Sequence, residues 1–314
     1  MEIKERYNHL NKYLKDKFGE RTLKICIDGN FTCPNRDGTS GFGGCIFCSE
    51  KGSGEHIKIA ESIPKQVENY FKSYKSERAN KFIAYFQNFT NTYDSVENLK
   101  LKYDSALIDD RIVALAIATR PDCINEDIVK LLKSYSNKYY VWVELGLQTS
   151  NEKTGNLINR CYSNTDFSNA VKLLNKYNID VVAHIMVGLP NETNRDIENT
   201  VDFINKHNIQ GLKIHSCYVI KNTVLGKMYE SGNYSPISLE QYLCNVSYIL
   251  THINPNVIIH RVSGDAPKDL LLAPDWNLHK KWIINGLDEL LKEENLYQGM
   301  YYKKTRNFEM NPPY

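Results

Sequence analysis

Short apolar segments alternate with longer amphipathic segments along the first two thirds of the chain. The apolar segments are rich in β-branched and aromatic residues and are bounded by polar residues, which favours β-strands. The predicted strands are residues 23–27, 82–86, 113–119, 140–145, 180–186 and 211–215. Strands that alternate with helices indicate parallel βαβ units, so we expect an α/β fold.

The segments between the predicted strands carry apolar residues at helical spacing. Within residues 193–207, for example, Ile197, Val201 and Ile204 lie on one face of a helix. The predicted helices are residues 1–21, 62–74, 96–106, 125–135, 166–177 and 193–207. Six βα units are too few to close an eight-stranded barrel, but functional residues are expected at the carboxyl ends of the strands in any such arrangement.

Beyond about residue 220 the regular alternation ends. The predicted elements there are helices over residues 223–229, 238–253 and 278–291 and a strand over residues 257–262. We therefore expect a core formed by residues 1–220 and a C-terminal extension, residues 221–314, that packs on this core.

The composition fits a soluble globular protein with a substantial core. Hydrophobic residues make up 42% of the 314 residues, and the formal net charge at pH 7 is +2. No apolar run approaches the ~20 residues that cross a bilayer, and the charged N-terminal segment lacks the apolar centre of a signal peptide. We expect a cytoplasmic protein without a membrane partner, whose thiols are reduced.

A nearly neutral net charge neither requires nor excludes a nucleic-acid partner. Such a partner would have to meet a local basic surface. The candidates for that surface are Lys4, Arg6, Lys12, Lys15, Lys17, Arg21 and Lys24 near the N-terminus, and Lys303, Lys304 and Arg306 in the tail.

The strongest candidate site is a glycine-rich loop after the first predicted strand. It contains Cys33, Cys45 and Cys48 with the spacing C-x11-C-x2-C. Thiolates bind zinc or iron–sulfur clusters, and N–H groups of a tightly curled loop stabilise the charge on sulfur. Three thiolates leave one iron of a four-iron cluster open for a small molecule, as in a catalytic centre. The alternative is a structural zinc site with His56 as the fourth ligand.

This loop resembles the cluster loop of the radical S-adenosylmethionine (SAM) enzymes, which carry an aromatic residue just before the last cysteine. Phe47 has that position here. The long first gap departs from the usual C-x3-C and is similar to the bacterial YhcC/YtqA-type subgroup, which is related to the radical SAM half of the elongator catalytic subunit. The resemblance covers about residues 5–300. It implies a partial (β/α)6 radical SAM barrel with a C-terminal α+β extension, one [4Fe–4S] cluster held by the three cysteines, and SAM.

The resemblance also implies which residues bind SAM. The methionine amino group would meet the end of the second strand, the ribose hydroxyls and the carboxylate would meet the segment 143–163, and the adenine would meet the turn after the fifth strand. The expected cofactor-binding residues are Phe47, Gln87, Asn88, Thr90, Glu144, Gln148, Arg160 and Gly188. Cys161 and Tyr162 stand where the subgroup has Gly-His.

Several of these residues have plainer interpretations. Gln87, Asn88 and Thr90 could form a polar turn, and Glu144 could be a buried ion-pair residue, because a carboxylate after an apolar run must be paired. Other polar residues are ambiguous in the same way. Arg120 could form a structural salt bridge, or face substrate or SAM. His184 is expected to be a hydrogen-bonded barrel residue, and Arg261, Asp265 and Trp276 could pack or contact substrate.

His215 and Lys221 follow the sixth predicted strand, and we expect them at the mouth of the barrel as catalytic or substrate-contacting residues. The remaining cysteines that we considered have no ligand spacing and are expected to be buried thiols. They are Cys26, Cys123, Cys217 and Cys244.

The function that the resemblance implies is radical chemistry on tRNA. One electron from a donor such as flavodoxin or ferredoxin would cleave SAM to a 5′-deoxyadenosyl radical, which would take a hydrogen from the 5-carboxymethylaminomethyl group of wobble uridine. Loss of the carboxymethyl part would leave 5-aminomethyluridine. Three alternatives stay open: a small-molecule substrate such as a porphyrin precursor, a different tRNA modification, and a non-catalytic, zinc-stabilised nucleic-acid-binding module. The sequence does not indicate an oligomeric state.

Overall fold

The computed structural model describes residues 5–52, 54 and 61–303. Its main feature is a seven-stranded sheet with the order β1-β2-β3-β4-β5-β6-β8, in which every neighbouring pair is parallel. The strands are β1 Thr22–Ile27, β2 Lys81–Phe86, β3 Ile112–Thr119, β4 Tyr140–Gln148, β5 Asp180–Val187, β6 Gly211–Ser216 and β8 Ile258–Arg261. All six strands of the predicted core form in chain order, so the expected α/β barrel class is confirmed.

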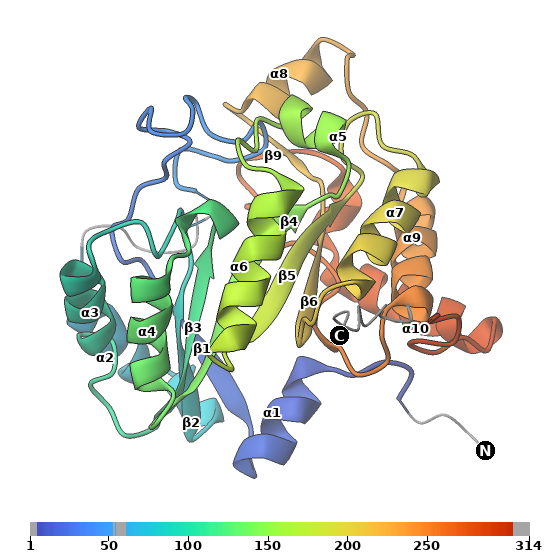
Figure 1. The fold of residues 1–314 in the computed structure, drawn as a ribbon. Helices are drawn as coiled ribbons and strands as arrows, with labels where there is room; N and C mark the ends of the chain where they lie inside the picture. The colour runs from blue at the N-terminus through green and yellow to red at the C-terminus, as the bar shows by residue number, and fades with distance from the viewer. Residues whose placement is uncertain (1–4, 53, 55–60, 304–314) are drawn as a thin grey trace, which may run out of the picture.

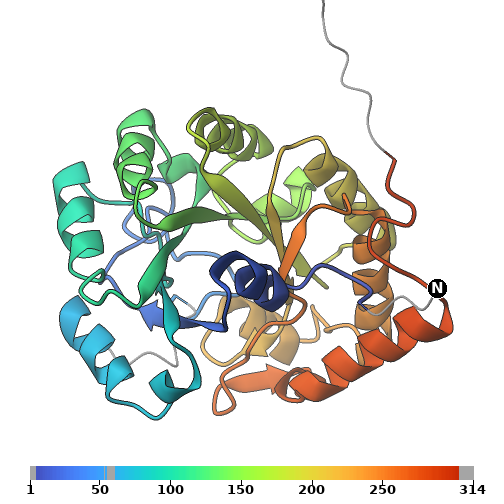
Figure 2. The same cartoon turned by 90° about the horizontal axis from the view of Figure 1, so that it is seen from below.

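The sheet curls into an open half-barrel with helices on its outer face (Figure 1). Seen from below, these helices form an outer ring (Figure 2). They are α2 Ile63–Phe71, α3 Val96–Asp104, α4 Glu126–Tyr135, α6 Asn164–Lys176, α7 Asn194–Asn205, α9 Leu239–His252 and α10 Lys280–Glu293.

Alternation along the strands divides the core into two parts. In β2, Phe82, Ala84 and Phe86 belong to the large outer core between the sheet and its helices. Ile83 and Tyr85 belong to a smaller core inside the barrel. Because side chains point to opposite faces with a period of two, strands that are covered on both faces read as continuous apolar segments.

Helix α1, Leu10–Phe18, closes the lower end of the barrel (Figure 2). It is shorter than the predicted 1–21, and it ends at Gly19, whose φ of 78° only glycine adopts readily. Leu10 and Leu14 face the inner core, and His9 forms a parallel β-bridge with Ile259 of β8. The helix therefore lies between the two edge strands, β1 and β8, that would otherwise leave the half-barrel open.

The C-terminal part does more than pack on the core. Its strand β8, which was predicted as residues 257–262, joins the main sheet beside β6. The rest forms α8 Val224–Glu230, α9, α10 and a small antiparallel pair, β7 Val219–Ile220 with β9 Leu271–Ala273. That pair and the short helix α5, Glu152–Leu157, were not predicted. The boundary at residue 220 stays a prediction.

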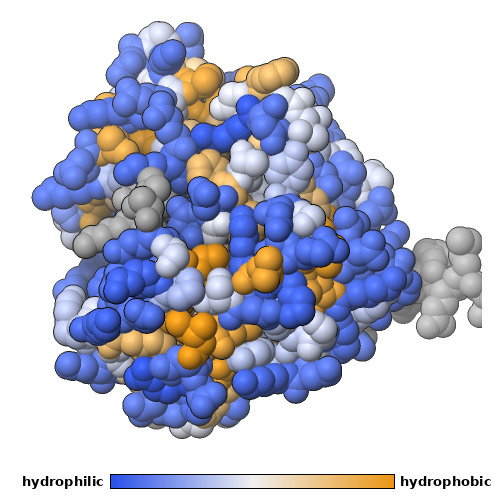
Figure 3. Space-filling model, turned by 90° about the vertical axis from the view of Figure 1, so that its left-hand side faces the viewer, coloured by the Kyte–Doolittle hydropathy of each residue, from blue (hydrophilic) through white to orange (hydrophobic). Residues whose placement is uncertain are grey.

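The face that carries α2 and α3 is mainly hydrophilic, with several separate apolar patches (Figure 3). Within the described residues, no helix combines the length and the apolar character that crossing a membrane requires.

Leu14 provides a test of the role of α1. We expect Leu14→Ala to lower the free energy of unfolding by about 2–5 kcal/mol, because the side chain is 2% exposed and fills the floor of the barrel. The matched control is Leu101→Ala on α3, where the side chain is 68% exposed and a change within about 0.5 kcal/mol is expected. Calorimetry of the two variants measures both effects, and equal losses would contradict a packed floor.

Candidate active site

The cysteine loop lies at the carboxyl end of β1, at the upper end of the barrel (Figure 1). Cys33, Cys45 and Cys48 all line one large cavity of about 1120 Å³ that extends down the barrel to α1. Among the described residues, no three Cys, His, Asp or Glu side chains gather around one point where a single metal ion would be held. A four-iron cluster needs no such point, because each thiolate binds a different iron. His56, the proposed zinc ligand, lies outside the described residues.

The segment that follows β4 holds this loop in place. Asn159 donates from Nδ2 to the carbonyl oxygens of Phe42 (3.0 Å) and Gly44 (2.8 Å). In return, Asn35 donates from Nδ2 to the Asn159 carbonyl (2.5 Å), and the same amide lies 3.8 Å from the Cys45 sulfur as a weak donor. Donors of this kind stabilise a thiolate. Asn159 was not among the predicted site residues, although it lies in the INRC segment of the motif that resembles the radical SAM subgroup.

Five of the expected cofactor-binding residues line the cavity near the cysteines: Phe47, Gln87, Asn88, Thr90 and Gln148. Two of them have buried oxygens without a hydrogen-bond partner in the structure, namely Oδ1 of Asn88 and Oγ1 of Thr90. Buried acceptors are normally satisfied, so these oxygens suit a ligand ammonium group. A simple turn would not account for these unpaired oxygens, and the contact of this strand end with the amino group of SAM stays a prediction.

Arg160 has a different role from the expected one. All five N–H donors of its buried guanidinium are taken by protein acceptors, mainly the carbonyl oxygens of Leu147, Thr149 and Tyr162, at 2.7–3.0 Å. Arg160 does not line the cavity. In this arrangement it clamps the loop after β4, and a bond to the SAM carboxylate would require it to give up these partners.

Gly188 and Lys221 also lie off the cavity wall. Gly188 has a φ of 91°, and its carbonyl accepts a hydrogen bond of 2.7 Å from the Tyr234 hydroxyl. Lys221 is exposed, and its ammonium donates to the Asp269 carbonyl at 3.3 Å. Asp269 itself lines the cavity, so Lys221 lies close to the cavity wall without lining it, and its catalytic or substrate-contacting role stays a prediction. His215, by contrast, does line the cavity.

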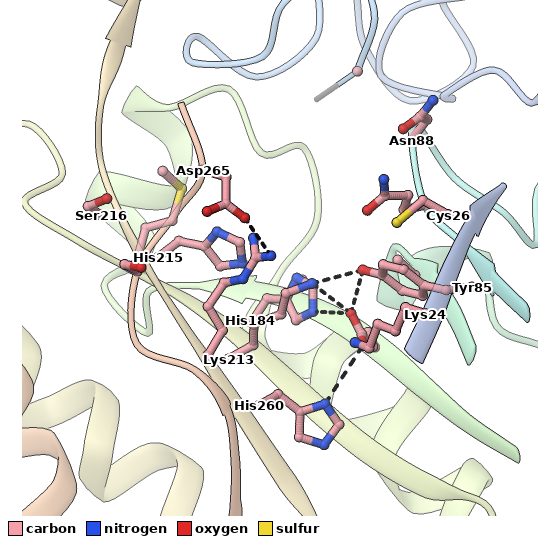
Figure 4. Close-up of a pocket in the computed structure, with 18 of the residues that line it drawn as sticks. Lys24, Cys26, Tyr85, Asn88, His184, Lys213, His215, Ser216, His260 and Asp265 are labelled. Carbon is pink, nitrogen blue, oxygen red and sulfur yellow. Dashed lines mark hydrogen bonds and ion pairs between the residues drawn. The ribbon is translucent and has the colours of Figure 1, made fainter. Parts of the chain in front are cut away.

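Lys24, Tyr85, His184, Lys213 and His260 line one part of the cavity, called the lower cavity below (Figure 4), and the buried carboxylate of Glu144 lies among them. Glu144 has no exposed surface. Its Oε2 accepts hydrogen bonds from the Tyr85 hydroxyl (2.7 Å), Nε2 of His184 (2.8 Å) and the Lys213 ammonium (2.9 Å). This oxygen therefore joins β2, β5 and β6 to β4.

The second oxygen of Glu144 is engaged as well. Oε1 accepts from the Trp142 indole (3.1 Å) and from the Lys24 ammonium (3.3 Å), which brings β1 into the network. Nδ1 of His260, from β8, lies 3.8 Å away, which is too long for a hydrogen bond. With both oxygens saturated, Glu144 has the geometry of the buried ion-pair alternative, and its contact with the SAM ribose stays a prediction.

Burial and pairing set the charges in this network. Burial alone would raise the pKa of Glu144, but Lys213 and Lys24 hold it well below the usual range, so it is a carboxylate. Burial lowers the pKa of Lys213 to about 8 despite its pairing with Glu144, so the amine is still mainly protonated at pH 7. Burial also lowers the pKa of His184 and of His260 to about 4, which leaves both imidazoles neutral.

Lys24 was placed on a candidate nucleic-acid surface, and that placement was wrong. It lies in β1 and points inward to Glu144, with 25% of its side chain exposed. Lys12, Lys15 and Lys17 are exposed, but α1 puts them at the opposite end of the barrel from the cysteines (Figure 1). Of the other members of that set, Lys4, Lys304 and Arg306 lie outside the described residues.

Four further residues of the network were not singled out in the sequence: Tyr85, Trp142, Lys213 and His260. The alternation of side chains along a strand could have indicated some of these residues. Trp142 and Glu144 lie on one face of β4, and Lys213 and His215 lie on one face of β6. His184 was expected to be a hydrogen-bonded barrel histidine, which its bond to Glu144 confirms.

The ambiguous residues at the mouth divide into two groups. Arg261 and Asp265 line the cavity and form an ion pair of 2.8 Å. Trp276 is instead a packing residue, whose ring lies 5.1 Å from the Tyr242 ring at a tilt of 35° and whose indole donates to the Ile237 carbonyl. Arg120 pairs with Asp122 at 2.7 Å, which agrees with the salt-bridge alternative; it also lines the cavity, and its contact with substrate or SAM stays a prediction.

Tyr162, which replaces a histidine of the resembling motif, lines the cavity beside Arg120. The other thiols are only partly as expected. Cys217 is buried, Cys26 and Cys123 are half-buried, and Cys244 is exposed, which corrects the expectation for Cys244. Helix α9 exposes that position because Tyr242, Asn245 and Val246 form its buried face.

Comparisons with known proteins agree with this site. The sequence matches the Radical SAM superfamily over residues 33–204 and the Radical_SAM C-terminal domain over residues 209–293. It is 38% identical to YtqA of Bacillus subtilis over 96% of this chain and 94% of that protein. It is 33% identical to YhcC of Escherichia coli K12 over 94% of this chain and 96% of that protein.

Two more distant relatives extend the comparison. A tRNA uridine(34) acetyltransferase of Methanocaldococcus infernus is 29% identical over 62% of this chain and 34% of that protein. The solved structure of the Elp3 protein of the same archaeon, shortened at its N-terminus, superposes with a TM-score of 0.63 at 18% identity. It matches 88% of this chain, which spans 64% of that chain, and so shows the same fold.

Glu144→Gln tests the buried ion-pair role. The substitution leaves two buried ammonium groups without their carboxylate, which we expect to cost on the order of 3–5 kcal/mol and to lower Tm on the order of 10 °C. Adding Lys24→Met should recover part of the loss, because it removes one of the two like charges. Calorimetry at matched iron content measures both. An equally stable Glu144→Gln protein with weakened SAM binding would instead favour the ribose contact.

Proposed function

The chain belongs to the radical SAM superfamily, and we propose that its substrate is the modified wobble uridine of tRNA. Members of this superfamily use a [4Fe–4S] cluster and SAM, which together supply a 5′-deoxyadenosyl radical when one electron cleaves SAM. Because the chain belongs to this superfamily, we favour an enzyme over a non-catalytic, zinc-stabilised nucleic-acid-binding module.

The residues of this chain have separate tasks in such a reaction. Cys33, Cys45 and Cys48 would hold the cluster on the cavity wall. The unpartnered oxygens of Asn88 and Thr90 would accept hydrogen bonds from the ammonium group of SAM. The strands surround the deep part of the cavity, and limiting the access of water there would protect a reactive species from side reactions.

The observation that carries the tRNA proposal is the similarity to the tRNA uridine(34) acetyltransferase, whose name states that it acts on the wobble position. The similarity spans 200 residues. The proposed reaction removes the carboxymethyl part of 5-carboxymethylaminomethyluridine and leaves 5-aminomethyluridine. Flavodoxin or ferredoxin is the proposed electron donor, and the cytoplasm, where tRNA is found, is the proposed location.

The charges around the cavity support an anionic substrate. Among the described residues, seven basic side chains line it: Lys24, Arg36, Arg120, Lys213, Arg261, Lys268 and Lys280. Only three acidic side chains line it: Glu144, Asp265 and Asp269. A cleft lined by one sign of charge raises the local concentration of ligands of opposite sign.

The cluster assignment is tested by single cysteine substitutions. We expect Cys33→Ala, Cys45→Ala and Cys48→Ala each to lose iron and SAM cleavage. Cys26→Ala is the matched control, because Cys26 lines the same cavity outside the loop and should be dispensable. Iron analysis and 5′-deoxyadenosine release measure the two properties. Iron loss in Cys26→Ala with retention in Cys33→Ala would show that the ligands are wrongly assigned.

The substrate is tested by nucleoside analysis. tRNA that carries 5-carboxymethylaminomethyluridine is incubated with reconstituted protein, SAM and a reductant, digested, and analysed by mass spectrometry. We expect 5-aminomethyluridine to appear and the starting nucleoside to fall, with no change when Cys45→Ala protein is used. SAM cleavage with an unaltered nucleoside profile would remove this substrate from consideration.

A further inference from the structure

The lower cavity contains more positive charge than its own carboxylate neutralises. The ammonium groups of Lys24 and Lys213 lie 3.3 Å and 2.9 Å from the same residue, Glu144. The next acidic group along the wall, Asp265, is already paired with Arg261 (2.8 Å). Two cations thus share one anion, and one positive charge of the network remains uncompensated.

An uncompensated charge in a nearly closed site is costly unless a ligand completes the pairing. The side chain of Lys213 is 7% exposed, and that of Glu144 is fully buried. The imidazoles beside them add no further charge, because the lowered pKa values keep His184 and His260 neutral. Solvent screens the positive charge poorly at Lys213 and more strongly at Lys24, whose side chain is 25% exposed.

The same region contains polar atoms without partners. Nε2 of His215 and Nδ1 of His260 are buried and make no hydrogen bond in the structure. Both residues line the cavity, and 6% of the His260 side chain is exposed. The His215 ring lies 5.4 Å from the His184 ring, on the side of the network that faces the mouth (Figure 4). Unpartnered nitrogens beside a surplus cation are suited to an anionic ligand that also forms hydrogen bonds.

The Lys24–Lys213–Glu144 network lies well below the strand ends, and this depth indicates which kind of anion can reach it. Glu144 lies four residues before Gln148, the last residue of β4, which is roughly 13 Å along a strand. Lys24 lies three residues before Ile27, where β1 ends and the cysteine loop begins. RNA phosphates belong to a backbone that would stay at the mouth. A carboxylate at the end of a slender arm on a base can reach this depth.

We infer that the Lys24–Lys213–Glu144 network is the recognition site for the carboxylate of the substrate arm. The inference rests on the proposed function, in which the wobble base carries a carboxymethyl group. Binding this carboxylate compensates the surplus charge and fixes the adjacent methylene group in the cavity. Lys24 and Lys213 are then specificity-determining residues that distinguish a carboxymethylated arm from one without a carboxylate.

The test compares two anticodon stem–loop RNAs that differ in one group. One carries 5-carboxymethylaminomethyluridine at the wobble position, and the other carries the same arm with a carboxamide in place of the carboxylate. Affinity is measured by fluorescence anisotropy with the cluster-loaded protein and SAM, without reductant. We expect the wild type to prefer the carboxylate by roughly tenfold or more, as for a charge-assisted hydrogen bond.

Four proteins separate charge from structure. Lys24→Met balances the network and should reduce the preference to within about twofold, whereas Lys24→Arg keeps the charge and should keep the preference. Adding Glu144→Gln to Lys24→Met restores one surplus cation, Lys213, and should restore the preference. Lys172→Met on the exposed face of α6 is the control that should match the wild type. A purely structural network would not produce this loss and recovery.

Each adverse outcome has a distinct meaning. Equal affinity of the wild type for both RNAs, with conversion of the substrate, would overturn the inference and leave the proposed function standing. A preference for the carboxylate without conversion would keep the site and remove the proposed reaction. Binding of neither RNA would contradict both. If Lys24→Met weakened SAM binding alone, the anion would be the carboxylate of SAM, and the inference would be wrong.

Discussion

One carboxylate links most of the strands of this half-barrel. Glu144 on β4 accepts hydrogen bonds from side chains on β1, β2, β5 and β6, and from Trp142 on its own strand. An open parallel sheet has no hydrogen bonds between its two edges, so its curvature depends on contacts across the interior. The buried charge makes these contacts obligatory, since a partner that moved away would leave an unpaired buried group.

The interior is therefore layered from bottom to top. Helix α1 forms an apolar floor with Leu10 and Leu14. The charged network lies above it, and the strand ends and cysteine loop form the upper layer. The upper layer is held by backbone and amide contacts, such as those of Asn159, and by the buried guanidinium of Arg160, which clamps the loop after β4. This division separates cofactor binding at the mouth from the proposed substrate recognition in the depth.

The elements that were predictable are those with local signals. The strands are short apolar segments between amphipathic helices, and the three cysteines stand out because a glycine-rich loop contains them. For Lys24 and Lys213 the only sequence signal was the alternation along their strands. A lysine inside a strand is normally interpreted as a surface residue until the opposite strands are placed around it. Arg160 matched a motif, but five acceptors that come together only in the folded loop use all its donors. Long-range pairing, and not local propensity, decided these positions.

The central claim is that the upper layer binds a four-iron cluster whose open iron takes SAM. Electron paramagnetic resonance of the reduced, anaerobically reconstituted protein tests it most directly, together with metal analysis. If the open iron binds SAM, we expect about four irons per chain and a cluster signal whose g-values change when SAM is added. A protein that holds one zinc and no iron, or a cluster signal that is indifferent to SAM, would contradict it.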